Sequence, residues 1–341
     1  MRVGICDFPS SYAFPPHGYG GIERWLWAVA IGARRSGAEV HLLGPGWRDD
    51  LPGEFPRLPI RLENISPGGK EFDQLRRLRL DLLVVGHEYP SHPAWRAVWS
   101  ELGCDVVTFQ HDPDFRHAPE AFDGSRSRLY CYSPEMMARY RVDRPRQDLS
   151  VQFGLGEENP APARPGEDLV WIGRVDADKA PHVAALTASK LGRRLRIVGP
   201  VLDHDYLGAH QEILGRPGIE LVGELAGAAK LDALRTARTM VYTCARKYVE
   251  AGAAVFGESL RAGTPVAALA WRSGTCAHAA LCDGTGRLAQ VDPSVDDETA
   301  ATSLAEVITA VERLDAGLAQ EIGLSRFDPQ RHFQVLAARQ C

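Results

Sequence analysis

The feature that most constrains the fold is an alternation of short apolar runs with stretches of helical periodicity. Apolar runs that end in turn residues and alternate with helices are typical of βαβ units and parallel sheets. In the first half of the chain, the predicted strands are Arg2–Asp7, Glu39–Leu43, Leu80–Gly86, Asp105–Thr108 and a run around Leu129–Tyr132.

The alternation restarts after Gly154–Gly166, a segment rich in Pro, Gly and Glu that reads as a linker. The second set of predicted strands is Asp168–Gly173, Leu195–Gly199, Ile219–Gly223, Met240–Thr243 and Pro265–Leu269. The predicted helices are Gly21–Arg35, Pro181–Lys190, Lys230–Ala237, Gly257–Ala262, Glu298–Leu314 and a weakly amphipathic one over Asp328–Gln340. We therefore predict an α/β protein with two Rossmann-like domains facing one cleft, beyond the carboxyl ends of the strands.

Length and composition agree with this organisation and exclude several function classes. The 341 residues suit two domains, and 45% of them are hydrophobic, which is enough for two cores. A formal net charge of −5 gives no support to nucleic-acid binding. No apolar run approaches the roughly 18 residues of a membrane span, and the start MRVGICDF has no signal-peptide pattern, so we expect a cytoplasmic protein. The seven cysteines are scattered without a CxxC pair, which argues against a disulfide framework or a structural zinc site.

Gly173–Lys179 follows a predicted strand and precedes a helix. The cationic side chains of Arg174 and Lys179 can converge on such a turn and bind a diphosphate, assisted by the positive end of the helix. A solvated surface turn has the same spacing, so both interpretations stay open at this point.

Glu250 and Glu258 stand eight residues apart, with small residues between them. A loop carboxylate and a helix carboxylate at this spacing can contact two parts of one ligand. The small residues Ala251–Ala254 let backbone amides approach an oxyanion. Two exposed glutamates are the alternative.

Gly20 and Gly21 follow the first strand and open a helix, where backbone N–H groups can contact phosphate or sugar; a simple tight turn is the alternative. The GxGxxG spacing of dinucleotide sites is absent. His111 ends a strand, as a site residue or as a structural one. His87 and His92 lie in HEYPSH, which lacks the HExxH spacing, so we predict no metal site there.

The order of these motifs resembles the retaining GT4 family of glycosyltransferases, which have the GT-B fold. The correspondence includes GGxE at 20–23, a TxHD-like segment at 108–112 with one extra residue, and GRxxxxK at 173–179. The E-x7-E pair then leads into ESLRAGTPV from Glu258, and DGTGRL follows at 283–288. The resemblance covers nearly the whole chain, and its second half is the more specific. Within the family, the chain is similar to a glycosyltransferase of antibiotic biosynthesis.

This resemblance implies transfer of a sugar from a nucleotide-sugar donor, with UDP favoured, to an oligosaccharide or natural-product acceptor. It implies no cofactor and no metal. Arg174 and Lys179 neutralise the leaving diphosphate, Glu258 accepts from the ribose, Glu250 accepts from the sugar, and His111 lies near the anomeric centre. The implied donor-binding set also includes Gly20, Gly21, Gly173, the backbone of Val222, Gly223 and Glu224, and the amides of Gly252, Ala253 and Ala254.

The resemblance also implies domain boundaries, and it leaves two alternative functions open. Residues 1–157, joined by a returning helix at 328–341, form the acceptor domain, and residues 158–327 form the donor domain. The family's EPFG is here Glu250-Ala-Gly-Ala, and the loop before it is longer and more basic, which puts the donor sugar in doubt. An NAD(P)-dependent oxidoreductase and a non-catalytic two-lobed binding protein are the alternatives. Five of the seven tryptophans lie in the first half, which suggests an aromatic acceptor cleft.

Overall fold

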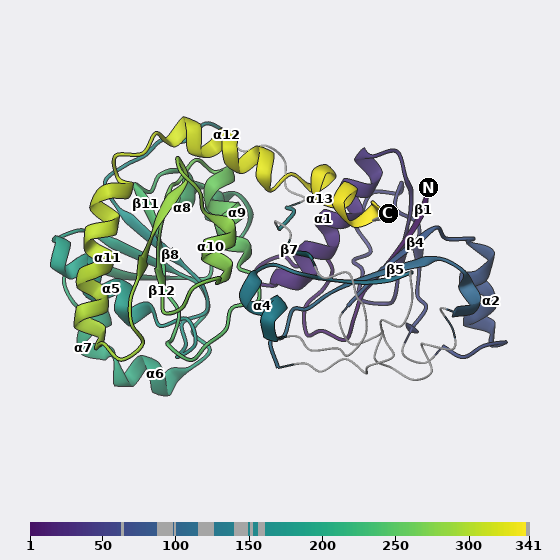
Figure 1. The fold of residues 1–341 in the computed structure, drawn as a ribbon, viewed down its shortest axis with the longest axis horizontal. Coiled ribbons are helices and arrows are strands. Elements are labelled where there is room, and N and C mark those ends of the chain that lie inside the picture. Colours follow the sequence, from purple (N-terminus) through teal and green to yellow (C-terminus); the bar gives the residue numbers. More distant parts are fainter. Residues whose placement is uncertain are drawn as a thin grey trace. The chain divides into compact units, whose positions relative to one another are not determined.

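The computed structural model describes residues 1–62, 65–86, 98, 100–114, 126–139, 149–150, 153–155 and 161–338. The chain divides into two compact units. The first comprises Met1–Pro16, Gly20–Glu157 and Asp328–Cys341, and the second comprises His17–Tyr19 and Glu158–Phe327. Figure 1 shows a sheet with flanking helices in each unit.

The first unit is built on a parallel sheet in the order β3-β2-β1-β4-β5-β6-β7. Its strands are β1 (Arg2–Cys6), β2 (Glu39–Leu43), β3 (Arg57–Leu58), β4 (Leu82–Val85), β5 (Asp105–Phe109), β6 (Ser127–Cys131) and β7 (Leu149–Ser150). Its helices are α1 (Gly21–Arg35), α2 (Lys70–Arg77), α4 (Pro134–Arg139) and α13 (Pro329–Ala337). The inner strands are apolar and fully buried, as expected for a parallel sheet covered on both faces.

The last helix, α13, packs on α1 inside this first unit. Phe333 and Leu336 are buried, and Nε1 of Trp25 in α1 donates to Nε2 of His332 over 2.8 Å. Gly32 makes the close approach possible, because a Cβ there would lie 1.9 Å from the carbonyl oxygen of Pro329.

The second unit has a parallel sheet in the order β10-β9-β8-β11-β12-β13. Its strands are β8 (Leu169–Ile172), β9 (Leu195–Val198), β10 (Ile219–Gly223), β11 (Thr239–Tyr242), β12 (Val266–Ala270) and β13 (Gly286–Gln290). Its helices are α5 (Pro181–Leu191), α6 (His204–Ala209), α7 (Gln211–Leu214), α8 (Gly227–Arg235), α9 (Ala254–Arg261), α10 (Cys276–Ala280), α11 (Asp297–Val311) and α12 (Ala316–Arg326). Helix α5 packs with α11, and α9 packs with α8, α10 and α12.

The predicted fold class is confirmed, since both units have the strand order of Rossmann-like sheets. Some predicted boundaries were wrong. Helix α9 begins at Ala254 rather than at Gly257, because the preceding small residues are compatible with helix and no breaker intervenes. The short strands β3 and β7 and the edge strand β13 were not predicted.

Candidate functional site in the second unit

The turn after β8 carries the predicted diphosphate motif. Strand order reverses between β8 and β11, so their carboxyl ends flank the switch point where ligands bind in such sheets. The amide of Gly173 donates to the carbonyl of Val198 over 3.0 Å, and that of Val175 to the carbonyl of Pro200 over 2.9 Å. These bonds fix the turn at the switch point.

Arg174 lies in this turn with two carboxylates around its guanidinium. Its Nε is 2.9 Å from Oδ2 of Asp176, and its Nη2 is 3.5 Å from Oδ2 of Asp178. Burial lowers the pKa of Arg174, but the negative groups around it outweigh this effect and raise the pKa above its ordinary value. The guanidinium is therefore a permanent positive charge at the end of β8.

Lys179 and Glu250 form an ion pair at the same place. Nζ of Lys179 donates to Oε2 of Glu250, and both side chains are largely buried. The ammonium also lies 4.8 Å from the ring centre of Tyr248. Burial lowers the pKa of Lys179, yet the negative charge of Glu250 outweighs it and the pKa lies above its ordinary value. The ammonium of Lys179 therefore stays charged, and the Glu250 carboxylate is its ion-pair partner.

The backbone after Lys179 is held in an unfavourable conformation. Ala180 has φ 47° and ψ 52°, a left-handed conformation that costs a residue with a Cβ about 1–2 kcal/mol. Oγ1 of Thr243 lies 2.9 Å from the carbonyl oxygen of Lys179 and accepts from the buried Trp171 indole, also over 2.9 Å. Strain of this kind persists where the surroundings impose it, and it is concentrated at functional sites.

Glu258 has a partner that the sequence did not reveal. Its carboxylate, on α9, is almost fully buried and contacts Nζ of Lys230 on α8 through both oxygens, at 2.7 and 2.6 Å. We missed Lys230 because it belongs to none of the motifs and because nothing in the spacing brings α8 beside α9. Helix α9 begins at Ala254, directly after Gly252 and Ala253, and no side chain caps its N-terminus.

The predicted base contacts lie at the end of β10. Gly223 has φ 85°, which favours glycine, and its carbonyl accepts from the amide of Gly199 over 2.9 Å. Val222 is half-buried and Glu224 is exposed. Oε1 of Glu224 accepts from the amide of Tyr19, in the short segment that belongs to the same unit.

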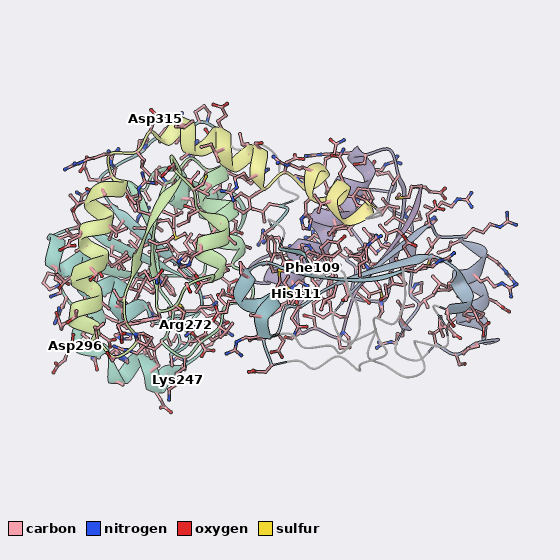
Figure 2. All side chains as sticks on the ribbon, in the orientation of Figure 1. Phe109, His111, Lys247, Arg272, Asp296 and Asp315 are labelled. Atoms are coloured by element: carbon pink, nitrogen blue, oxygen red, sulfur yellow. The ribbon has the colours of Figure 1, made fainter. Side chains whose placement is uncertain are left out.

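The remaining predicted site residues belong to the first unit. Gly20 is the N-cap of α1 with φ 142°, which requires glycine, and Gly21 starts the helix with open space where a Cβ would point. His111 lies two residues beyond β5, near Phe109 (Figure 2). Its ring centre is 4.8 Å from that of Trp25. An aromatic neighbourhood therefore orients His111.

No group of three His, Cys, Asp or Glu side chains suited to a metal occurs in the described part of the chain. His87 and His92 lie outside the described residues. Three aspartates of the second unit that stand in Asp-x-Asp sequences have local partners: Asp176 and Asp178 contact Arg174, and Asp203 caps α6. None of the helices at the described positions has the length and hydropathy that a membrane crossing requires.

Comparison with known family models gives a match in the first part of the chain. Residues 19–144 match the model of Glycosyltransferase Family 4. The match ends before β8, so Arg174, Lys179, Glu250 and Glu258 lie outside it.

Solved structures share the fold of this chain over nearly its whole length. AviGT4, a glycosyltransferase involved in avilamycin A biosynthesis, is 20% identical with a TM-score of 0.74, over 98% of this chain and 95% of its own. WaaG, involved in lipopolysaccharide biosynthesis, is 16% identical with a TM-score of 0.65, over 99% and 100%. Alr3699/HepE from Anabaena, solved with UDP and glucose, is 15% identical with a TM-score of 0.62, over 99% and 98%. No significant match was found among curated proteins.

Three of the five tryptophans in the first half of the chain are described, and they pack within the first unit. Trp25 and Trp47 are buried in the core of the first unit, and Trp27 packs on Phe55. Trp95 and Trp99 lie outside the described residues. Tryptophan counts cannot separate core from cleft, because the same indole suits both.

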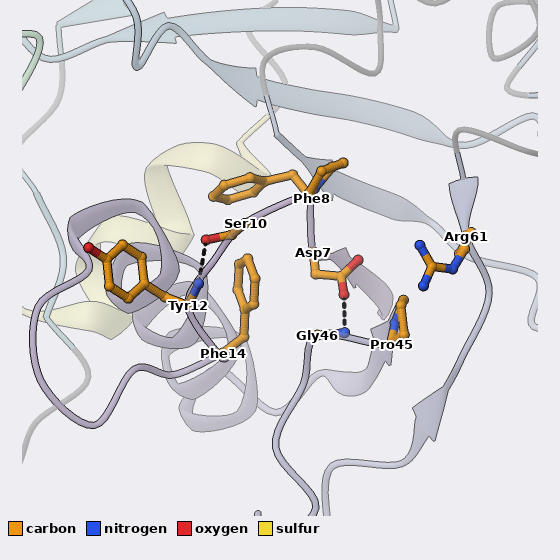
Figure 3. A pocket seen from close by; sticks show the side chains of 9 residues that line it. Asp7, Phe8, Ser10, Tyr12, Phe14, Pro45, Gly46 and Arg61 are labelled. Atoms are coloured by element: carbon orange, nitrogen blue, oxygen red, sulfur yellow. Dashed lines mark hydrogen bonds between the residues drawn. The ribbon is translucent and has the colours of Figure 1, made fainter.

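A pocket of about 270 Å³ instead lies at the carboxyl ends of β1 and β2 in the first unit (Figure 3). Phe8, Tyr12 and Phe14 contribute rings to it, and Asp7 and Arg61 contribute charges. Asp7 is only 4% exposed, and its Oδ2 accepts from the amide of Gly46.

Two glycines beside this pocket make room for the Asp7 carboxylate. A Cβ on Gly44, whose φ is 109°, would lie 1.7 Å from Oδ1 of Asp7, and one on Gly46 would lie 2.7 Å from Oδ2. The G-P-G sequence at 44–46 therefore admits a carboxylate into an aromatic pocket.

Proposed function

We propose that the protein is a retaining, metal-independent glycosyltransferase, which transfers a sugar from a UDP-sugar to a hydroxyl group of a sugar-containing acceptor. The observation that carries the proposal is the group at the switch point of the second sheet, where Arg174 lies at the end of β8 and Lys179 pairs with Glu250. Two cations there suit the two phosphates of a nucleotide diphosphate. The structures of Alr3699/HepE with UDP and glucose support UDP as the nucleotide.

In the proposed reaction, the bond between the anomeric carbon and the phosphate oxygen breaks, and its electron pair goes to the diphosphate. Arg174 and Lys179 stabilise that charge. The acceptor oxygen bonds to the anomeric carbon, and its proton passes to the leaving phosphate oxygen. Glu250 accepts from a hydroxyl of the transferred sugar, and His111 lies near the anomeric centre. The cations do here what a metal ion does in other transferases.

The nucleoside is proposed to bind at Glu258 and at the end of β10. Glu258 accepts from the ribose hydroxyls, Lys230 holds its carboxylate in place, and the backbone of Val222–Glu224 contacts the base. Calorimetry with UDP, GDP and dTDP tests the nucleotide. Binding of GDP or dTDP at least about tenfold tighter than UDP, a difference of 1.4 kcal/mol, would overturn the base assignment and leave the site intact.

We expect Glu258→Gln and Lys230→Met to weaken UDP binding by roughly 10- to 100-fold, because a hydrogen bond to a charged group contributes about 1.5–3 kcal/mol. Turnover at saturating donor should change little, since ribose contacts are similar in the ground and transition states. The measurement is UDP calorimetry with steady-state kinetics. Arg235→Gln, which breaks an exposed Asp232 contact on the same helix α8, is the control and should bind UDP normally.

The acceptor is proposed to place one sugar ring in the pocket of the first unit. Aromatic faces pack on the C–H face of a sugar, a carboxylate accepts from its hydroxyls, and a guanidinium donates to its oxygens. The pocket is smaller than the 300–1,000 Å³ typical of sites for drug-sized ligands, so it suits a single ring. Its two opposite charges, on Asp7 and Arg61, favour a ring without net charge.

We expect Asp7→Asn to raise the KM for acceptor by roughly tenfold or more, since it removes a charge-assisted hydrogen bond. Asparagine keeps an oxygen for the Gly46 amide, so the loop should stay folded. The assay compares UDP release from UDP-glucose with and without methyl glycosides and disaccharides. Asp50→Asn, at an exposed Arg48 pair, is the control. Full acceptor stimulation of the Asp7 variant would remove the pocket from the proposal.

A further inference from the structure

The loop 243–250, which ends at Glu250, is held in the second unit by contacts with cationic and aromatic side chains. Nη2 of Arg272 donates to the carbonyl of Tyr248 over 2.7 Å, and its Nη1 donates to the carbonyl of Arg246. The indole of Trp271 donates to the carbonyl of Cys244 over 2.7 Å. Figure 2 shows Arg272 and Lys247 in this region. The two residues that directly follow β12 therefore fix the backbone of the loop.

Arg246 fixes the loop from its other side. Its guanidinium lies 4.5 Å from the ring centre of Trp271, and its Nη2 donates to the carbonyl of Val295 over 2.7 Å. The same nitrogen lies 2.8 Å from Oδ1 of Asp297, the first residue of α11. Arg246 thus connects the loop to the start of a helix that carries none of the donor-site residues.

The second oxygen of Asp297 is held by a buried chain of polar groups. Oδ2 lies 3.0 Å from Nε2 of His182, whose Nδ1 lies 2.6 Å from the hydroxyl of Tyr206. The Asp297 carboxylate can only accept, so Nε2 of His182 donates to it and the Tyr206 hydroxyl donates to Nδ1 of the neutral ring. That hydroxyl also accepts from the backbone amide of His182. Each oxygen of Asp297 has one assigned partner, His182 or Arg246.

We infer that Asp297 is a positioning residue for sugar transfer, which through Arg246 fixes the loop 243–250 and so holds Glu250 beside Lys179. His182 and Tyr206 orient its carboxylate. The inference rests on the proposed function, because it assigns the role to the loop that carries the sugar-binding glutamate. Misplacement of a catalytic group by about 1 Å can cost roughly 100-fold in rate, so a fixed loop matters to this reaction.

A purely structural role predicts something different. The side chains of Arg246 and Asp297 are each about one-third exposed, and pairs of this kind contribute little to stability. A second ion pair, Lys190 with Glu298 at 2.6 Å, also joins α5 to α11 and does not involve the loop. The packing of α11 on α5 therefore does not depend on Asp297 alone. Asp297 and Glu298 are adjacent, so substitutions at these two positions form a matched pair for a test.

The test compares Asp297→Asn with Glu298→Gln in the full chain. His182 and Arg246 bind different oxygens of Asp297, so in an asparagine the NH2 group, itself a donor, would face one of these two donors. We expect Asp297→Asn to lower kcat for the UDP-sugar at least tenfold while UDP affinity and the melting temperature stay near wild type. Glu298→Gln should behave as wild type. Arg246→Met should lose as much as Asp297→Asn, and the double variant should lose no more than either, because both break one contact.

Hydrogen exchange of the peptide that covers 243–250 gives a readout that needs no substrate. We expect exchange at least tenfold faster in Asp297→Asn and unchanged in Glu298→Gln. Equal exchange in wild type and Asp297→Asn would overturn the inference whatever the activity. Wild-type turnover in Asp297→Asn, or an equal loss in Glu298→Gln, would also overturn it. Absence of transfer by the wild type with every UDP-sugar would instead reject the proposed function, and the exchange result would still decide the anchoring.

Discussion

Arg174→Ala is expected to lower the turnover number about 100- to 1,000-fold while the protein stays folded. Interactions with the leaving diphosphate strengthen in the transition state, and loss of one such donor typically costs roughly 3–4 kcal/mol. The guanidinium is partly exposed, so its removal leaves no cavity in the core. Steady-state kinetics and a thermal melt measure the two effects. A metal chelator should leave wild-type turnover unchanged, because the side chains of Arg174 and Lys179 stabilise the leaving diphosphate in place of a metal ion.

Asp178→Asn is the control for this prediction. Asp178 contacts Arg174 from the same turn but is half exposed, and it should keep near-normal turnover. An Arg174→Ala enzyme that melts normally and turns over like wild type would show the turn to be a surface feature.

Lys179→Ala is expected to affect stability as well as activity, unlike Arg174→Ala. Its ion pair with Glu250 is buried, so Lys179→Ala is expected to destabilise the fold as well as abolish transfer.

Gly32→Ala is expected to destabilise the first unit, although helix propensity alone predicts the opposite. In a helix interior, Ala is favoured over Gly by about 1 kcal/mol. A methyl group here meets the Pro329 carbonyl at 1.9 Å, however, and backbone atoms cannot move aside without separating α13 from α1. We expect a net loss of about 2 kcal/mol or more, as in other overpacked sites. For a unit of this size, the melting temperature should fall by about 4–8 °C.

Gly21→Ala is the matched control, since Gly21 lies in the same helix and nothing lies within 4 Å of where its Cβ would be. Its melting temperature should not fall. Phe333→Ala gives an independent measure of the same interface and should cost roughly 3–5 kcal/mol. A Gly32→Ala protein as stable as wild type would mean that α13 does not pack on α1 in solution.

The sequence by itself determined the elements and the chemistry of the motifs. Alternating runs indicated two parallel sheets, because local periodicity directly reflects whether a segment is strand or helix. The motif residues Arg174, Lys179, Glu250 and Glu258 were identified by their order along the chain. Both inferences depend only on residues that are close in sequence.

The tertiary structure decided which of these residues meet, and through what partners. The pairing of Lys179 with Glu250 spans 71 positions, and that of Lys230 with Glu258 joins two helices whose packing no spacing encodes. The burial of Trp25, the room that Gly44 leaves for Asp7, and the link from Asp297 to Arg246 depend likewise on contacts between distant segments. Such contacts follow from how sheets and helices pack, and side-chain pattern along a single element carries no information on its neighbours.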